Sequence, residues 1–251
     1  MTTASPLPEG ERQASDVANW AQRVSDLELS RVPTGALNLN VEGRLAVGPL
    51  QGFGQLWQKT YRIQLPDVEL TPVEVMQIWK QNFTKFLPPN TRFFPVERRV
   101  APGEILLIND SMTGMPVSTG VVVLYADEES FTVMTPQGHP ESGWNTFSTA
   151  LVDGCLVCQI QSMARANDPI YELGFHLWAS RVQERIWVYV LEALATHFQV
   201  QGQQVTISKV CIDPRLQWSE ARNIWHNAAL RTMFYTCLAP LRWLRRKFSP
   251  Q

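Results

Sequence analysis

The chain has 251 residues, of which 45% are hydrophobic and 18% charged, with 22 basic and 23 acidic side chains. This composition is typical of a globular protein with a sizeable core, and it excludes intrinsic disorder. The net charge of −1 argues against a general nucleic-acid binder. Four cysteines do not make a disulfide scaffold in a chain of this length, so we expect a reducing, cytoplasmic location.

The first 36 residues are predicted to form an N-terminal extension. Val17, Trp20, Val24 and Leu27 recur at helical spacing, which predicts a short amphipathic helix. We expect this helix to lie outside the main domain.

Beyond the extension, apolar residues alternate with polar ones, as in half-buried strands. Eight strands are predicted, over residues 37–47, 56–65, 93–100, 104–109, 117–125, 130–135, 144–152 and 155–163. A helix interrupts them, because Thr71, Pro72 and Glu74 form a capping box at its start. Asp153 and Gly154 are the strongest hairpin signal in the chain. Most of these strands therefore follow one another as an antiparallel meander.

A long helix is predicted from Pro169 to Phe198, directly after Asp168. Its apolar residues step by three or four and give it one large aromatic face. At about 1.5 Å per residue the helix would span roughly 45 Å, enough to cross a whole sheet. A curved sheet and this helix would bury each other's apolar faces, and the curvature would leave a gap between them. Such gaps are a usual origin of apolar ligand pockets.

Three segments carry a resemblance to a known family. They are Gly52-Phe53-Gly54-Gln55-Leu56-Trp57, Gly138-His139-Pro140-Glu141-Ser142-Gly143 and Val182-Gln183-Glu184-Arg185. They resemble a domain-of-unknown-function family with a GHPESG box, found in bacteria and plants, which is similar to the START-like, helix-grip (SRPBCC) superfamily. The resemblance implies a hydrophobic cavity for lipids, sterols, polyketides or plant hormones, and a minority of helix-grip relatives are enzymes. Because the family has no established activity, no catalytic residue is transferred from it.

The predicted fold class is therefore α+β: a helix-grip domain in which a curved antiparallel sheet wraps the long helix. This domain spans residues 37–200, between the extension of residues 1–36 and a C-terminal extension of residues 201–251. Additional helices are expected at both ends of the chain.

Residues of the long helix and of the strands that face it would contact a ligand in the cavity. The predicted contacts are Tyr61, Tyr125, His139, Glu141, Trp144, Tyr171, Phe175 and Trp178. Alternation does not fix which face of each strand points toward the helix. An aromatic face of this kind is more often ordinary core than a binding surface.

The loop of the GHPESG box has two interpretations. In the functional one, the imidazole of His139 pairs with the carboxylate of Glu141 at the cavity mouth, as an acid–base pair or as a polar clamp on a ligand. In the structural one, both residues satisfy backbone groups, and the glycines supply positive φ angles.

Neither a metal nor a cofactor is expected. Cys155 and Cys158 match a CxxC motif in letters, but positions three apart on a strand point to opposite faces and cannot share a metal. His176, His197 and His226 are isolated in the sequence. The glycines of the GFG segment lack the remainder of a dinucleotide-binding fingerprint.

The C-terminal segment is basic and amphipathic. Its predicted membrane contacts are Leu241, Arg242, Trp243, Leu244, Arg245, Arg246, Lys247 and Phe248. Anionic headgroups attract basic residues by about 1 kcal/mol each near a membrane surface. The alternative is a terminal helix docked on the domain or on a partner.

Three functions are compatible with these features. The first is binding of a hydrophobic or amphipathic, lipid-like small molecule in the cavity, with an anionic membrane surface as a second partner. The second is an enzyme of the same fold that uses His139 and Glu141. The third is an interaction protein whose cavity is filled by its own side chains. No nucleic-acid partner and no particular oligomeric state are predicted.

Overall fold

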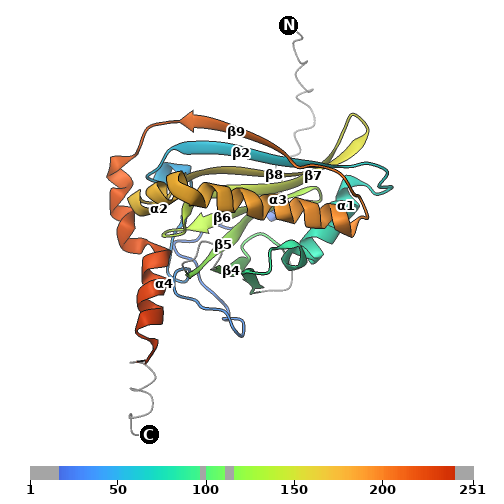
Figure 1. The fold of residues 1–251 in the computed structure, drawn as a ribbon. Coiled ribbons are helices and arrows are strands. Elements are labelled where there is room, and N and C mark those ends of the chain that lie inside the picture. The colour runs from blue at the N-terminus through green and yellow to red at the C-terminus, as the bar shows by residue number, and fades with distance from the viewer. Residues whose placement is uncertain (1–16, 97–99, 111–115, 241–251) are drawn as a thin grey trace.

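The computed structural model describes residues 17–96, 100–110 and 116–240, apart from the side chains of Trp178 and Ala179. Within this part, nine strands form one antiparallel sheet (Figure 1). They are β1 (Ala46–Val47), β2 (Leu56–Leu65), β3 (Thr91–Pro95), β4 (Ile105–Asp110), β5 (Val117–Ala126), β6 (Ser130–Pro136), β7 (Glu141–Val152), β8 (Cys155–Ala166) and β9 (Thr206–Asp213). Their order is β3-β4-β5-β6-β7-β8-β2-β9, and β1 pairs with β6.

The helices lie where the caps and the periodicity predict them. They are α1 (Pro72–Gln81), α2 (Pro169–Gly174), α3 (Ser180–His197) and α4 (Ala228–Cys237), with a π-helical turn at Phe175–Ala179 and 3-10 helices η3 (Phe83–Phe86) and η5 (Trp218–His226). At the start of α1, the Thr71 hydroxyl accepts a hydrogen bond from the Glu74 amide at 3.2 Å. In return, the Glu74 carboxylate accepts one from the Thr71 amide at 2.8 Å. The predicted capping box is thus present.

The predicted long helix is confirmed as a nearly continuous rod of α2, the π-helical turn and α3, which crosses one face of the sheet (Figure 1). Asp168 caps it, because its carboxylate accepts hydrogen bonds from the amides of Ile170 and Tyr171 at 2.9 and 3.1 Å. The sheet and this rod form the helix-grip arrangement expected from the sequence.

Packing between the rod and the sheet is dense in the C-terminal half of the rod. Phe131 and Phe147 stack there with ring centroids 4.5 Å apart. Trp187 of α3 contacts the edge of the Phe147 ring at 5.7 Å. Trp79 of α1 approaches the same ring from its side, at 5.6 Å. This part of the interface is a filled aromatic core.

The prediction of a helix over residues 17–27 is wrong. Only Val17–Asn19 form a short 3-10 helix, and Trp20 then bridges to Tyr125 in an extended conformation. The amide of Ala21 donates to the carbonyl of Leu124 at 2.8 Å, so the segment runs along the sheet. Leu27 is buried, whereas Val17 and Val24 are exposed, so the helical spacing of these residues does not reflect a helix face that packs on the domain.

The prediction of a strand over residues 37–47 is also wrong, except for its last two residues, β1. The Asn38 side chain accepts a hydrogen bond from the Glu42 amide at 3.2 Å, and Gly43 adopts a φ of 70°. Such side-chain-to-backbone bonds and a positive φ bend the chain into turns, which override the alternation of apolar residues.

The segment after residue 200 continues the same sheet. β9 pairs with β2 from Arg62↔Thr206 to Leu56↔Asp213. η5 and α4 then lie at the α2 end of the molecule (Figure 1). The predicted C-terminal extension therefore contributes an edge strand to the sheet as well as helices.

Candidate functional site

The strand register determines which side chains face the long helix. Lys59, Ser162 and Asn145 are cross-strand neighbours on β2, β8 and β7. The ammonium of Lys59 donates to the hydroxyl of Ser180 on α3 at 3.2 Å, so this row faces the helix. We call this side the inner face of the sheet.

The inner face changes character between two neighbouring rows. The row of Tyr61, Ile160 and Phe147 is apolar and completely buried. The next row along the strands is polar, with Lys59 at its β2 end. The helix above changes in the same direction, because Leu191 and Leu194 pack in the core whereas Ser180 and Gln183 contact Lys59. Core and polar site are therefore adjacent parts of one interface.

A pocket of about 260 Å³ lies at the polar end, between α2, the π-helical turn, the start of α3 and the strands β2, β8 and β9. Ser162, Ala164 and Ala166 of β8 form part of its floor, and Ser180 lies on the helix side. These small side chains leave the space that phenylalanine and tryptophan fill further along the interface. Phe175 of the π-helical turn closes part of the wall.

Gln183 connects two buried ionisable groups beside this pocket. Its side-chain oxygen accepts a hydrogen bond from the Lys59 ammonium at 2.8 Å. Its amide nitrogen donates to the carboxylate of Glu141 at 2.6 Å. Burial lowers the pKa of Lys59 and raises the pKa of Glu141, while the attraction between the two charges opposes both shifts. The pocket thus offers a donor and an acceptor in a desolvated site.

The three segments that carry the family resemblance meet here. Trp57, from the GFGQLW segment, lines the pocket together with Glu141 of the GHPESG box. Gln183, from the VQER segment, joins Glu141 to Lys59. A Cβ atom at Gly54 would lie 2.8 Å from the Cβ atom of Ala166, too close for a side chain here without a shift of the backbone. Residues more than 100 positions apart in the chain therefore build one site.

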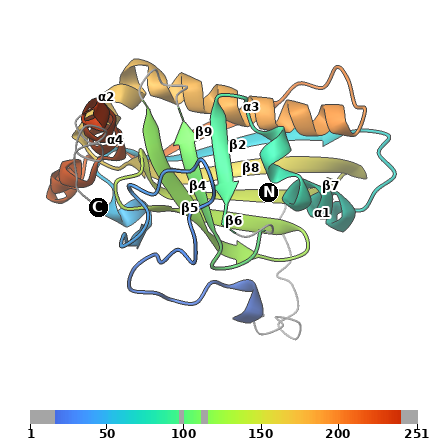
Figure 2. The same ribbon diagram turned by 90° about the horizontal axis from the view of Figure 1, so that it is seen from below.

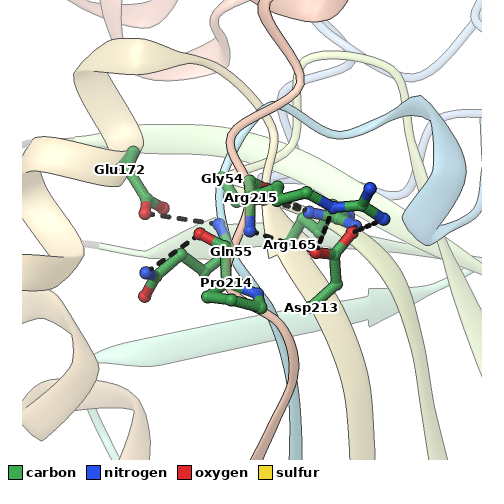
Figure 3. A network of polar contacts seen from close by, with 7 residues as sticks. All are labelled: Gly54, Gln55, Arg165, Glu172, Asp213, Pro214 and Arg215. Atoms are coloured by element: carbon green, nitrogen blue, oxygen red, sulfur yellow. Dashed lines mark hydrogen bonds and ion pairs between the residues drawn. The ribbon is translucent and has the colours of Figure 1, made fainter.

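A buried arginine fixes the mouth of the pocket to the C-terminal segment (Figure 3). Arg165 donates to the carbonyls of Gly54 and Arg215 at 2.7 and 2.9 Å, and to the carboxylate of Asp213 at 2.6 Å. Hydrogen bonds from the side chains of Arg215 and Arg165 hold the pKa of Asp213 well below its usual range.

A second set of contacts in Figure 3 attaches α2 to the same mouth. The Glu172 carboxylate accepts a hydrogen bond from the Gln55 amide at 3.3 Å. The Gln55 side chain donates to the carbonyl of Pro214 at 3.2 Å. His176 contacts the Glu172 carboxylate at 3.2 Å. The pocket rim is therefore held by polar contacts from three parts of the chain.

The expected pairing of the His139 imidazole with the Glu141 carboxylate is not formed. The Nδ1 atom of His139 accepts a hydrogen bond from the backbone amide of Glu141 at 3.0 Å. Burial lowers the pKa of His139 to about 4, so the ring is neutral at pH 7. Gly138 adopts a φ of 92°, as the structural interpretation of this loop requires. The loop therefore positions Glu141, which lines the pocket, whereas His139 does not line it.

Two predicted contacts point away from the helix. Trp144 is the cross-strand neighbour of Met163 and Met134, on the outer face of the sheet. Tyr125 also lies on that face, where its ring contacts Trp20 at 4.7 Å. Their assignment to the inner cavity is wrong, because alternation divides a strand into two sets without saying which set faces the helix.

The remaining predicted contacts are divided between core and pocket. Tyr61 is completely buried in the aromatic core beside the pocket, and its hydroxyl has no hydrogen-bond partner among the described residues. The Tyr171 hydroxyl accepts a hydrogen bond from the Ala229 amide at 2.9 Å, so this ring anchors α4 and is not a ligand contact. Phe175 lines the pocket. The side chain of Trp178 lies outside the described part of the structure.

The sequence patterns did not identify Lys59 or Gln183 as site residues. The alternation of side chains along β2 could have indicated Lys59, because it places Lys59 on the same side of the strand as the buried residues Tyr61, Ile63 and Leu65. Among the described residues, no group of three or more His, Cys, Asp or Glu side chains is placed to hold a metal ion.

Scanned against protein-family models and against curated proteins, the chain matches none. Among solved structures it is similar to a START superfamily protein from Mycobacterium smegmatis, with 16% identity, a TM-score of 0.41, and coverage of 58% of this chain and 98% of that one. It is also similar to the di-domain ARO/CYC StfQ from the steffimycin biosynthetic pathway (11% identity, TM-score 0.44, 58% and 51% coverage). A third neighbour is Ara h 8.0201 (12% identity, TM-score 0.41, 57% and 98% coverage).

These likenesses are too distant to carry an argument about function. The helix-grip arrangement is seen directly in the antiparallel sheet and in the long helix across its inner face.

Proposed function

We propose that the chain binds a small amphipathic molecule in the pocket under the N-terminal half of the long helix. The convergence of Trp57, Glu141 and Gln183 on this pocket is the observation that supports the proposal most strongly. A polar group of the ligand would exchange hydrogen bonds with Lys59 and Glu141. Its apolar part would lie against Trp57 and Phe175.

The dimensions of the site restrict the ligand. Pockets for drug-sized molecules usually have about 300–1,000 Å³, and this one has about 260 Å³. The aromatic core around Phe147 and Trp187 closes the inner end, so a whole sterol or a folded acyl chain does not fit under the helix. The proposed ligand is therefore a compact molecule, or one end of a larger molecule that extends outward.

Acid–base catalysis by His139 and Glu141 together is not supported by this geometry. The ring of His139 is occupied by the backbone of the GHPESG loop and is neutral at pH 7. Glu141 remains available to a ligand as an acceptor, or as a donor when protonated.

A second proposal concerns the membrane surface, and it is favoured by apolar side chains exposed at the α2 end of the molecule. Leu173 and Leu177 are 61% and 60% exposed, Trp218 and Trp225 are 72% and 79% exposed, and Phe234 is 62% exposed. Exposed apolar clusters mark protein or membrane contacts. The predicted contact residues 241–248 lie outside the described part of the chain, and no described helix is long and apolar enough to cross a bilayer.

Sedimentation with anionic liposomes tests the membrane proposal. Removal of residues 241–251 is expected to abolish co-sedimentation, and Trp225→Ser to reduce it. Gln64→Ser, at an exposed polar position of β2, is the control and should leave co-sedimentation unchanged. Equal sedimentation of all variants would refute the membrane contact.

Mass spectrometry of the full chain after mild purification and denaturing extraction tests the binding proposal. The wild type is expected to release a near-stoichiometric small molecule. Ala164→Leu, which fills the pocket floor, is expected to release none, and its folding is checked by circular dichroism because overpacking costs about 1–3 kcal/mol. Ala150→Leu, at an exposed position of β7, is the matched control and should retain the ligand.

Two results would contradict the binding proposal. One is the absence of any bound species from repeated wild-type preparations. The other is equal occupancy in the wild type and in folded Ala164→Leu protein.

A further inference from the structure

A second and larger hollow, of about 1,260 Å³, lies on the opposite side of the sheet from α3. In Figure 2 the N-terminal segment, in blue, and α3 lie on opposite sides of the sheet. The floor of this hollow is the outer-face row of Val122, Met134, Trp144 and Met163, which are cross-strand neighbours. We call it the outer trough.

The walls of the outer trough come from the N-terminal third of the described chain. Val24 and Leu27 lie on one side, and Leu45, Val47 and Leu50 on another. The segment of residues 21–27 that passes over the sheet is tied to it by the Ala21–Leu124 hydrogen bond and the Trp20–Tyr125 bridge. The trough is thus a space between a sheet and a covering segment, built from residues outside the helix–sheet interface.

The lining of the trough is apolar, with a polar rim. Among the described residues that line it, Arg23 is the one with a charge, and Gln22, Ser25 and Gln51 are the other polar side chains. Two methionines and a tryptophan lie in its floor, and thioether side chains adapt to flexible apolar ligands.

Several apolar side chains at the rim have no cover in the described structure. Leu50 is 73% exposed, Val24 58% and Leu45 49%. Contiguous apolar exposure around a concavity indicates an occupant. Residues 1–16, the nearest segment in the sequence, contain one leucine and three acidic residues, so their composition does not suit an apolar trough.

We propose that the outer trough binds a long-chain carboxylic acid. The acyl chain would lie on Trp144, Met134 and Met163, and the carboxylate would face Arg23 at the rim. The volume admits an extended chain that the 260 Å³ inner pocket excludes. Charge complementarity favours an acid over a neutral hydrocarbon, because the single charged lining residue is a cation.

Calorimetric titration of the full chain with monomeric oleate tests this proposal. The wild type is expected to bind oleate saturably at one site. Met163→Glu introduces a carboxylate into the floor at a partly exposed position and should weaken oleate binding at least about tenfold. Ala164→Leu, the adjacent residue on the inner face, is the matched control and should bind oleate as the wild type does.

Arg23→Gln tests the position of the headgroup. Because Arg23 is exposed, its loss should weaken oleate binding by about two- to fivefold, and binding of oleyl alcohol should not change. Circular dichroism and the unfolding midpoint establish that each variant is folded.

Three outcomes would overturn the proposal. The first is the absence of saturable oleate binding to the wild type. The second is oleate binding that Ala164→Leu abolishes and Met163→Glu does not, which would place the acid in the inner pocket. The third is a concentration-dependent dimer that Met163→Glu dissociates, which would identify a second copy of the chain as the occupant.

Discussion

The two halves of the interface between the sheet and the long helix differ in chemistry although they share the same strands and the same helix. In the C-terminal half, Phe131, Phe147 and Trp187 fill the space completely. In the N-terminal half, Ser162 and Ala164 leave it open. The presence of a cavity in this arrangement is therefore decided by side-chain volume at each row, and sheet curvature alone does not create it.

The difference also extends to polarity. The filled half is built of aromatic side chains such as Phe131 and Phe147, whereas the open half holds Lys59 and Glu141 on either side of Gln183. Buried ionisable groups are costly unless they are paired, and here Lys59 and Glu141 both line the pocket. Substitutions in the filled half should therefore act mainly on stability, and changes in the open half should act on the buried polar groups.

Phe147→Ala is expected to have the largest effect, because it removes a ring that contacts Phe131, Trp79 and Trp187. Such truncations cost about 3–5 kcal/mol of the free energy of unfolding. Guanidinium denaturation measures the loss. Folded variant protein should still retain a pocket ligand, and loss of the ligand without loss of stability would show that the two halves are not distinct.

Acidification should act on the polar half through His139. Its pKa is lowered from 6.5 to about 4 in the folded chain, so the unfolded state binds more protons between these values. Stability should therefore fall as the pH decreases from about 6.5 to about 4, by up to about 3 kcal/mol from this group.

His139→Asn isolates that contribution, because the Asn side-chain oxygen can accept the same hydrogen bond from the Glu141 amide. Chemical denaturation at a series of pH values should show a smaller loss for the variant than for the wild type. Identical pH profiles would contradict the role assigned to His139.

Gln183→Leu should destabilise the chain by about 1–3 kcal/mol, because it removes the hydrogen bond to the Glu141 carboxylate and leaves Lys59 with Ser180 as its remaining partner. Gln64→Leu, an exposed glutamine on β2, is the matched control and should change stability by no more than about 0.5 kcal/mol. Comparable effects of the two variants in urea denaturation would argue that Gln183 is not buried between charges.

The smallest expected effect is that of Tyr61→Phe, at the border between the two halves. The Tyr61 hydroxyl is buried without a partner, so its removal should be neutral or stabilising by up to about 1 kcal/mol. Thermal and denaturant unfolding measure the change. A clear loss of stability would show that this hydroxyl has a partner, and that the open half extends further under the helix.

Most of the fold could be predicted from the sequence, because local signals and hydrophobic periodicity agree. Thr71 and Asp168 cap their helices as expected, and Asp153 and Gly154 form the turn between β7 and β8 with φ angles of 51° and 77°. The N-terminal segment could not be predicted, because Trp20 and its neighbours are determined by contacts with the distant strand β5.

The candidate site could be predicted only in part. Glu141 is predicted from the chemistry of the GHPESG loop and Phe175 from the helical pattern, and both line the pocket. No short sequence motif could identify Lys59 as a site residue, because its partners Ser180 and Gln183 lie more than 100 residues further along the chain. Long-range pairing creates this site, and no short motif contains it.

Tryptophan indole NMR locates a ligand most directly, because Trp57 lines the pocket, Trp187 lies in the filled core and Trp144 lies in the outer trough. We suggest titrating the full chain with 2-naphthol, which has an aromatic body and one hydroxyl group. Saturable shifts of the Trp57 indole resonance, with little change at Trp187 and Trp144, are the predicted result. Unchanged Trp57 resonances, or shifts confined to Trp187 or Trp144, would contradict a binding pocket under the N-terminal half of the helix.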